Sequence, residues 1–361
     1  MKLFFLPPKK ANYLIYDRVT LNTGMFEALF KIKNNFSVMD VRYESINLYI
    51  LFLSLITFKF KELKNIYKKK YLEIVKPKIV YTSIDNNPAF FNLKNLYPNA
   101  LYVSDQNGIA KVVGQSWPND FYKYCISFNK LNKKKLKSDL IFTFNENDKK
   151  YMSKIIESNV FALGNSKINN IKSVKKKIKK IIFINSGLFK QTINKDVQIF
   201  KIIKKYAYIH KYKLILLSRK GKTFEEFYRK KFGNGKWIYK SRDNVNSSYN
   251  FLKKSNDSII AFSHSTLGFE AMAIGFKCVI FLHKLAKKNS FWINSDKGFF
   301  WTNNLNYFSA KKLFDRVIKC DDKKWKLISK KISNKHMSYD FMNKKKKILI
   351  NKYLNIYKNN S

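Results

Sequence analysis

The chain has 361 residues, about the length of two ordinary domains. Hydrophobic residues make up 45% of it, including 32 Phe and 22 Tyr, which excludes an intrinsically disordered chain. The formal charge is +48, and the three Cys are too few and too irregularly spaced for a disulfide framework or a cysteine-based zinc site.

Short apolar or aromatic runs alternate with longer Lys-rich stretches of helical period through the first half of the chain. This alternation is typical of βαβ units and predicts a mostly parallel sheet. A helix is predicted from Asn145 to Glu157, with Asn145 as its N-cap. The predicted strands are Tyr13–Tyr16, Ser37–Val41, Leu48–Leu53, Lys78–Thr82, Ala100–Ser104, Leu140–Phe144 and Val160–Leu163.

The longest apolar stretch runs from Ile46 to Phe58, about 13 residues. A membrane-spanning helix needs ~20 residues, so this stretch is too short to span a bilayer. It is either a buried strand and helix or a segment at a membrane interface, and we favour burial. Pro7 and Pro8 end the apolar N-terminal run too early for a signal peptide. We therefore expect a cytoplasmic protein.

A polar, basic segment at Gly164–Lys180 interrupts the pattern and is interpreted as a linker. Beyond it the alternation resumes, and the last part, Ala310–Tyr357, is predicted to be helical. The predicted strands are Ile181–Asn185, Leu214–Ser218, Trp237–Tyr239, Ile259–Phe262 and Cys278–Leu282, with helices near Asp196–His210, Thr223–Phe232, Ser247–Lys254 and Leu267–Ile274.

These patterns predict an α/β protein with two Rossmann-like domains and a cleft between them. The N-terminal domain is expected over residues 1–165 and would bind an acceptor. The C-terminal domain is expected over 166–340 and would bind a nucleotide. Residues 341–361 are expected to form a last helix that packs back on the first domain.

Residues 263–268 (Ser-His-Ser-Thr-Leu-Gly) join a predicted strand to a short predicted helix. The free N–H groups and the dipole at a helix N-terminus favour a bound phosphate. Hydroxyls of Ser265 and Thr266 would add donors, and Gly268 would allow close approach of the backbone. Glu270 could accept the two ribose hydroxyls, and His264 could donate to a phosphate or to the leaving group. The structural alternative is that Ser265 or Thr266 is an N-cap and Glu270 its capping-box partner.

Residues 263–271, together with Gly275-Phe276-Lys277, resemble the donor-site motif of bacterial lipopolysaccharide and capsule glycosyltransferases of the GT-B type. Further blocks of similarity lie at 7–17, 105–108 and 298–302, scattered over most of the chain. Ile274 departs from the Arg often found there, so one basic donor contact is in doubt. The resemblance implies a nucleotide-sugar donor, with CMP-activated acidic sugars such as Kdo ahead of UDP- or GDP-sugars, and a glycan or lipid-linked acceptor.

The loops after two other predicted strands of the second half, one with Gly187 and one with Arg219 and Lys220, could contribute to donor binding, although both could be ordinary loops. No Asp-x-Asp motif is present, and GT-B enzymes can stabilise the departing phosphate without a metal, so no metal or other cofactor is expected. The expected donor-binding residues are Ser263, Ser265, Thr266, Leu267, Gly268 and Glu270, with Gly187, Arg219 and Lys220 from the other strand ends.

Asp105 follows a predicted strand of the first half and is the candidate catalytic carboxylate, as general base or as nucleophile. The alternative is that it only stabilises its own turn. His264 is the second catalytic candidate. The acceptor-side candidates are Asp17, Gly24, Gln106, Asn107 and Glu146.

The +48 charge has three explanations. It could attract the chain to the anionic inner face of a membrane, bind nucleic acid, or reflect the Lys-rich composition that an AT-rich genome produces. No common nucleic-acid motif, P-loop or Gly-x-Gly-x-x-Gly is present, so a peripheral membrane enzyme is favoured over a nucleic-acid partner. The alternative functions are a basic nucleic-acid-binding protein and a non-hydrolysing sugar-nucleotide epimerase.

Overall fold

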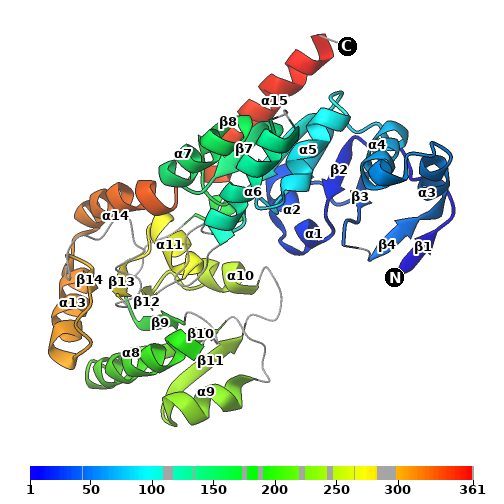
Figure 1. Cartoon of the computed structure of the whole chain (residues 1–361). Coiled ribbons are helices and arrows are strands. Elements are labelled where there is room, and N and C mark those ends of the chain that lie inside the picture. Colours follow the sequence, from blue (N-terminus) through cyan, green and yellow to red (C-terminus); the bar gives the residue numbers. More distant parts are fainter. Residues whose placement is uncertain are drawn as a thin grey trace. The chain divides into compact units, whose positions relative to one another are not determined.

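Two parallel β-sheets organise the chain, one in each of two units (Figure 1). Among the described residues, the first unit comprises those up to Asn170 together with those from Asp340 onward, and the second comprises those of Ile171–Tyr339. This computed structural model describes all residues except 43, 109–116, 133–134, 173–176, 186–189, 219–223, 242–246, 264, 283–297 and 360–361.

The sheet of the first unit has the strand order β3-β2-β5-β6-β7-β8, and every neighbouring pair is parallel. The order along the chain reverses between β2 and β5, and ligands of open α/β sheets bind beyond the strand ends at such a point. A separate pair of strands, β1 and β4, is also parallel. The strands are β1 (Lys2–Phe4), β2 (Tyr13–Tyr16), β3 (Phe36–Met39), β4 (Ser45–Asn47), β5 (Ile79–Thr82), β6 (Leu101–Asp105), β7 (Lys137–Thr143) and β8 (Glu157–Ala162).

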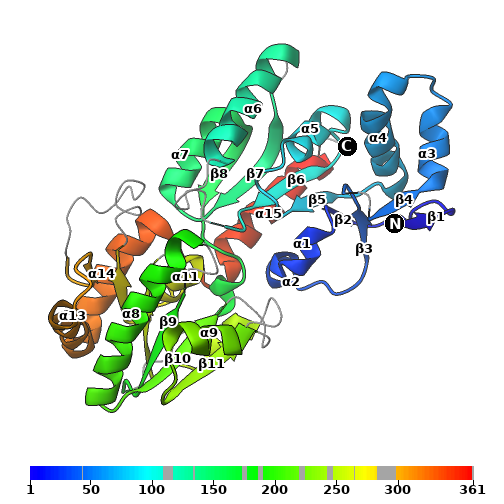
Figure 2. The same ribbon diagram turned by 60° about the horizontal axis from the view of Figure 1, so that its bottom comes forward.

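Helices cover both faces of this sheet (Figure 2). Side chains alternate across a strand, so Leu14 and Tyr16 of β2 pack into one core while Ile15 packs into the other. The first core holds side chains of α4 (Leu63–Val75), α5 (Pro88–Leu96), α6 (Trp117–Asn132) and α7 (Glu146–Ile155). The second holds side chains of α2 (Met25–Phe30) and α15 (Lys344–Asn359). The remaining short elements are α1 (Val19–Asn22), η1 (Phe60–Glu62), η2 (Ile168–Asn170) and η4 (Phe341–Asn343).

The sheet of the second unit has the order β11-β10-β9-β12-β13-β14, again all parallel. Counted from its first strand this is 3-2-1-4-5-6, the order of dinucleotide-binding folds, with the reversal between β9 and β12. Its strands are β9 (Lys180–Ile184), β10 (Lys213–Ser218), β11 (Trp237–Ser241), β12 (Ser258–Phe262), β13 (Cys278–Phe281) and β14 (Trp301–Thr302). Its helices are α8 (Lys190–Ile209), α9 (Glu225–Phe232), α10 (Ser247–Lys253), α11 (Thr266–Ala273), α13 (Tyr307–Lys319) and α14 (Asp322–His336).

The predicted α/β architecture with two Rossmann-like domains is confirmed, but the predicted strand Leu48–Leu53 is wrong. These residues belong to the helix α3 (Leu48–Leu55). Asn47 caps this helix, because its side-chain oxygen accepts a hydrogen bond from the N–H of Ile50 at 3.0 Å. In the part of the chain that the structure describes, no helix is long and apolar enough to cross a membrane.

Candidate functional site

The reversal point of the second sheet brings Asn185, directly after β9, to the same edge as Ser263, directly after β12. The hydroxyl group of Ser263 donates a hydrogen bond to Oδ1 of Asp196 at 3.2 Å. Asp196 lies on α8 and is fully buried. The sequence pattern predicted Ser263 as a donor-site residue, whereas Asp196 was predicted only as the first residue of a helix. The contact between them was not predictable from the sequence, because 67 residues separate them.

Helix α11 begins at this edge, and Ser265 is its N-cap. The side-chain oxygen of Ser265 accepts a hydrogen bond from the N–H of Gly268 at 3.4 Å. Ser265 and Thr266 are both partly exposed. A Cβ atom added to Gly268 would lie 2.4 Å from Cγ of Phe262. Glycine is therefore required here for packing α11 on β12, a reason that the sequence did not reveal.

Glu270 does not form the capping box that was the structural alternative. That motif places the acidic residue three positions after the N-cap, where this chain has Gly268. The carboxylate of Glu270 instead lies 3.3 and 3.1 Å from the hydroxyl oxygen of Tyr249 on α10, which donates to it. Glu270 is only 1% exposed. The sequence analysis did not select Tyr249, which the fold brings into contact with the candidate residue Glu270.

Asn185 carries a buried polar atom that is unpaired within the described part of the chain. Its Nδ2 group donates a hydrogen bond to the Tyr228 hydroxyl at 2.9 Å, whereas its buried Oδ1 atom has no hydrogen-bond partner among the residues that the structure describes. Leaving a buried acceptor unpaired is costly, so a ligand group that donates to Oδ1 would be stabilised here.

Of the remaining predicted donor-binding residues, Leu267 is buried within α11. His264, Gly187, Arg219 and Lys220 lie outside the described residues.

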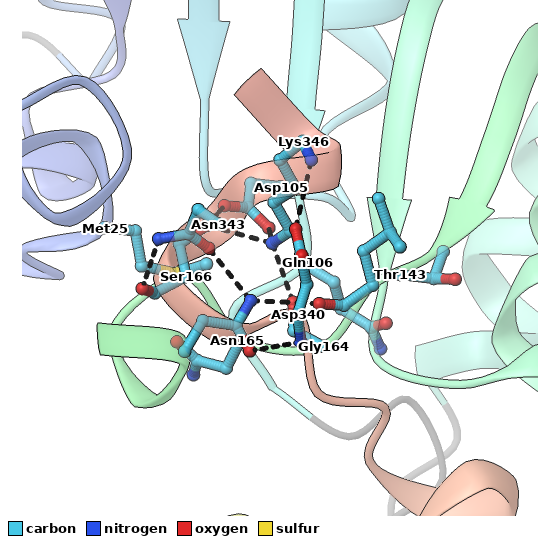
Figure 3. Close-up of polar contacts among 12 residues, drawn as sticks. Met25, Asp105, Gln106, Thr143, Gly164, Asn165, Ser166, Asp340, Asn343 and Lys346 are labelled. Carbon is cyan, nitrogen blue, oxygen red and sulfur yellow. Dashed lines mark hydrogen bonds and ion pairs between the residues drawn. The ribbon is translucent and has the colours of Figure 1, made fainter. Parts of the chain in front are cut away.

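In the first unit, Asp105 lies at the end of β6 within a buried polar network (Figure 3). Its Oδ1 atom is 2.9 Å from Nζ of Lys346, and neither side chain is exposed. Its Oδ2 atom accepts hydrogen bonds from the hydroxyl groups of Tyr81 and Ser166. Since both oxygens are occupied and shielded from solvent, proton transfer to Asp105 would first require this network to open.

Lys346 also donates from Nζ to the carbonyl oxygen of Gly164 at 2.7 Å and to the Ser166 hydroxyl at 2.9 Å. Burial lowers the pKa of Lys346, and the neighbouring Asp105 carboxylate partly offsets that effect. These contacts hold α15 against the end of β6. Asp105 and Lys346 therefore have a structural role in joining these two elements.

The acceptor-side candidates occupy different places in the first unit. Asp17 is buried after β2 with a left-handed φ of 73°, and it accepts hydrogen bonds from the N–H of Val19 at 3.0 Å and from Arg42 at 2.9 Å. Gly24 is the N-cap of α2 with a φ of 68°. Glu146 lies on the surface at the start of α7, 3.2 Å from Lys149.

Gln106 connects the end of β6 to α7. Its Nε2 group donates a hydrogen bond to Asp148 at 2.8 Å, and its Oε1 atom accepts one from the N–H of Phe144 at 2.6 Å. The predicted N-cap Asn145 is confirmed, because its side chain accepts a hydrogen bond from the N–H of Asp148 at 2.9 Å. These contacts fix the loop after β6.

Asp85 is a carboxylate in the first unit that the sequence analysis did not select. It follows β5 at the reversal point of the sheet and is partly exposed. Its Oδ1 atom lies 3.5 Å from the N–H of Asn107, the neighbour of the predicted Gln106. Burial raises the pKa of Asp85 to about 7, and the carboxylates of Asp148 and Asp105 raise it further. A carboxyl group whose pKa is raised towards neutral is suited to general base catalysis.

Comparisons with known proteins give one partial family match and a set of structures that share the fold. Residues 187–354 match the model of a family described as "putative O-antigen biosynthesis protein". This match spans the segment that holds Asp196, Tyr249 and Glu270. Among curated proteins, no sequence matches the chain.

Among solved structures, the chain is similar to a UDP-N-acetylglucosamine 2-epimerase, with 13% identity, a TM-score of 0.56, and coverage of 97% of this chain and 96% of that one. It is also similar to a glycosyltransferase from Rickettsia africae ESF-5, with 14% identity, a TM-score of 0.51, and coverage of 97% and 98%. A third similar structure is a sucrose-phosphate synthase from Thermosynechococcus elongatus, with 9% identity, a TM-score of 0.50, and coverage of 96% of this chain and 100% of that one. At such low identities these likenesses show a shared fold, the two Rossmann-like units of GT-B proteins.

Proposed function

We propose that this protein transfers a sugar from a nucleotide-sugar donor to a surface glycan such as lipopolysaccharide or capsule. The observation that carries the proposal is the Glu270–Tyr249 contact beside the capped start of α11, at the reversal point of a dinucleotide-type sheet. The match of this segment to an O-antigen biosynthesis family supports the same conclusion.

In the proposed donor complex, the N-terminal turn of α11 and the hydroxyls of Ser265 and Thr266 face the phosphate groups. Glu270 accepts the ribose hydroxyls. It is already held by Tyr249, so little ordering is needed when the nucleotide binds. Gly187, Arg219, Lys220 and His264 would add contacts from outside the described residues. A CMP-activated acidic sugar is the leading donor, on the resemblance of the motif.

For the acceptor side we propose Asp85 as general base, because Asp105 is fully buried and paired with Lys346. Asp85 is partly exposed, and in the described residues no Lys or Arg forms an ion pair with it. A base must be reachable by the acceptor hydroxyl and must be ionised at working pH. Asp85→Asn should then abolish sugar transfer while leaving nucleotide binding unchanged, since the nucleotide binds to the other unit.

We further propose that the enzyme works at the anionic inner surface of a membrane, where a lipid-linked acceptor would be found. The +48 charge supports this location. Basic side chains near such a surface each contribute about 1 kcal/mol of attraction, which salt screens.

The first experiment is a titration of the purified protein with CMP, UDP, GDP and ADP at moderately high salt, followed by Glu270→Gln. We expect one nucleotide to bind selectively and Glu270→Gln to weaken it by about 10- to 100-fold, the effect of losing a charged hydrogen-bond acceptor. The matched control is Glu226→Gln, which removes an exposed carboxylate from the same unit. Equal binding of all nucleotides, or equal effects of both variants, would refute the donor site. Conversion of a sugar nucleotide to its epimer without any acceptor would identify an epimerase instead.

A further inference from the structure

Large apolar side chains are exposed at one end of the first unit. Eleven of the 22 exposed large hydrophobic residues in the described part of the chain lie in two short segments, so the exposure is concentrated rather than general. We call this set the apolar patch. Its members are Met1, Leu3, Phe4, Phe5, Leu6, Tyr49, Phe52, Leu55, Ile56, Phe58 and Phe60.

The fold places the two segments of the apolar patch side by side. Strand β1 pairs in parallel with β4, and α3 follows β4 without a break. Nδ2 of Asn47, the N-cap of α3, donates a hydrogen bond to the carbonyl oxygen of Leu6 at 2.8 Å. In both views β1, β4, α3 and α4 lie together at one end of the first unit (Figures 1 and 2).

Helix α3 is apolar on all sides, yet it is buried on only one. Ile50 and Ser54 face the protein interior, whereas Tyr49, Phe52 and Ile56 are exposed at helical spacing on another face. A helix that is apolar all round is normally buried by a partner. The exposed side of α3 therefore has the composition of a surface that is covered in use.

The turn after α3 presents a further aromatic side chain at a conformational cost. Phe58 has a φ of 54°, in the left-handed region that Gly and Asn adopt more easily, and its side chain is 78% exposed. A glycine or an asparagine would satisfy this turn with less strain. Because most of its side chain is exposed, Phe58 contributes little packing within the described residues.

The charge around the apolar patch is mainly positive, although the exposed Glu62 lies at its border. Residues 1–10 and 48–61 contain five Lys and no Asp or Glu, and all five Lys side chains are exposed. Exposed aromatic and aliphatic side chains bordered by Lys are the composition of segments that insert into the interface of an anionic bilayer. A protein partner would need acidic side chains to match five Lys, whereas an anionic lipid surface supplies both the charge and the apolar phase. The five residues are Lys2, Lys9, Lys10, Lys59 and Lys61.

We propose that the apolar patch is a membrane-docking surface that inserts α3 and the 1–6 segment into the interface of an anionic lipid bilayer. Helices α3 and α4 also wall a cavity of about 240 Å³, lined in part by Leu51, Leu63 and Tyr67. This space lets α3 adjust its packing when it meets lipid. The inference rests on the membrane part of the proposed function and is independent of the sugar-transfer chemistry.

The test is flotation of the purified full-length protein with vesicles of phosphatidylcholine alone or mixed with phosphatidylglycerol. We expect binding to the anionic vesicles only, and at least a tenfold weaker partition for the double variant Phe52→Ser/Phe58→Ser. The matched control is Tyr208→Ser/Phe308→Ser, which removes two aromatic rings of similarly high exposure from the second unit and should bind like the wild type. Circular dichroism checks that every variant is folded.

A charge-matched pair of variants separates the patch from the overall charge. Lys59→Gln/Lys61→Gln/Lys64→Gln should weaken anionic-vesicle binding more than Lys230→Gln/Lys231→Gln/Lys236→Gln, which removes the same charge from the second unit. Equal losses, with both aromatic variants unaffected, would overturn the patch while leaving membrane attraction by the +48 charge intact. A stable dimer that the Phe52/Phe58 variant dissolves, seen by light scattering, would assign the patch to a second copy and also overturn the proposal.

Discussion

Nζ of Lys346 lies 2.9 Å from Oδ1 of Asp105, and both side chains are completely buried although 241 residues separate them in the chain. The pair joins α15 to the end of β6. A buried charge that has lost its partner is strongly destabilising, whereas removal of both charges costs much less. The two residues should therefore be energetically coupled.

Lys346→Met should reduce the free energy of unfolding by about 3–5 kcal/mol, because it leaves the Asp105 carboxylate buried without its counter-charge. The double variant Lys346→Met/Asp105→Asn should recover a large part of that loss. Chemical denaturation of the single and double variants gives the coupling energy. Lys345→Met, an exposed neighbour, is the control and should change stability by less than about 0.5 kcal/mol. Additive losses would contradict a coupled pair.

Most strands were predictable because their side chains are buried in the two cores of an open sheet. Ile259–Phe262 and Leu214–Leu217 are continuous apolar runs, as strands covered on both faces are. Helix α3 was mispredicted because an apolar run of this length fits a strand or a helix equally well, and only the cap at Asn47 separates the two.

The candidate site was predictable only where its chemistry is local. Ser265 and Glu270 lie within one strand, turn and helix, so their spacing in the sequence was informative. Tyr249 and Asp196 come from other helices and reach the site through the strand order, which the sequence does not state. Asp85 has an unusual pKa because of burial and two neighbouring carboxylates, and those surroundings exist only in the folded chain.

Gly268→Ala should destabilise the protein by about 1–3 kcal/mol, because the new methyl group would meet the ring of Phe262. Combining it with Phe262→Leu should cost less than the sum of the two single variants, since the smaller side chain gives the methyl group room. Thermal or chemical unfolding measures both effects. Gly108→Ala is the control, because a Cβ atom there meets nothing within 4 Å. A full loss of nucleotide binding without any loss of stability would instead indicate that Gly268 contacts the ligand.

Asp85 should make stability depend on pH. Its pKa is raised from 3.8 to about 7 in the folded protein, so the folded state favours the neutral form. The contribution of neutral Asp85 to the stability of the folded protein is complete below about pH 4, declines as pH rises, and is lost above about pH 7. Asp85→Asn should therefore gain stability over the wild type only as pH rises through that range. The full pKa difference corresponds to ~4 kcal/mol, but we expect about 1–2 kcal/mol because the side chain is partly exposed.

Denaturant titrations at about pH 4, 6 and 8 measure this difference. Glu226→Gln is the control and should change stability little at every pH, because its side chain is exposed. A gain for Asp85→Asn that is the same at all three pH values would show that the carboxyl group is not the cause. If Asp85 is also the general base, the rate of sugar transfer should rise through the same pH range.

The contact between Tyr249 and Glu270 leads to a prediction about nucleotide affinity. Tyr249→Phe removes the hydroxyl group that donates to the carboxylate at 3.1 Å but leaves the ring in place. The carboxylate of Glu270 keeps its charge and can still accept the ribose hydroxyls, although its orientation is less constrained. We expect nucleotide binding to weaken by about 3- to 10-fold, the effect of about 1 kcal/mol from one hydrogen bond.

Once Glu270→Gln is present, Tyr249→Phe should have little further effect, because a positioning residue acts only through the group that it positions. Calorimetric titration of the wild type, the two single variants and the double variant closes the cycle. If the two losses simply add, Tyr249 and Glu270 contribute independently, and the hydroxyl of Tyr249 does not position the carboxylate for ribose.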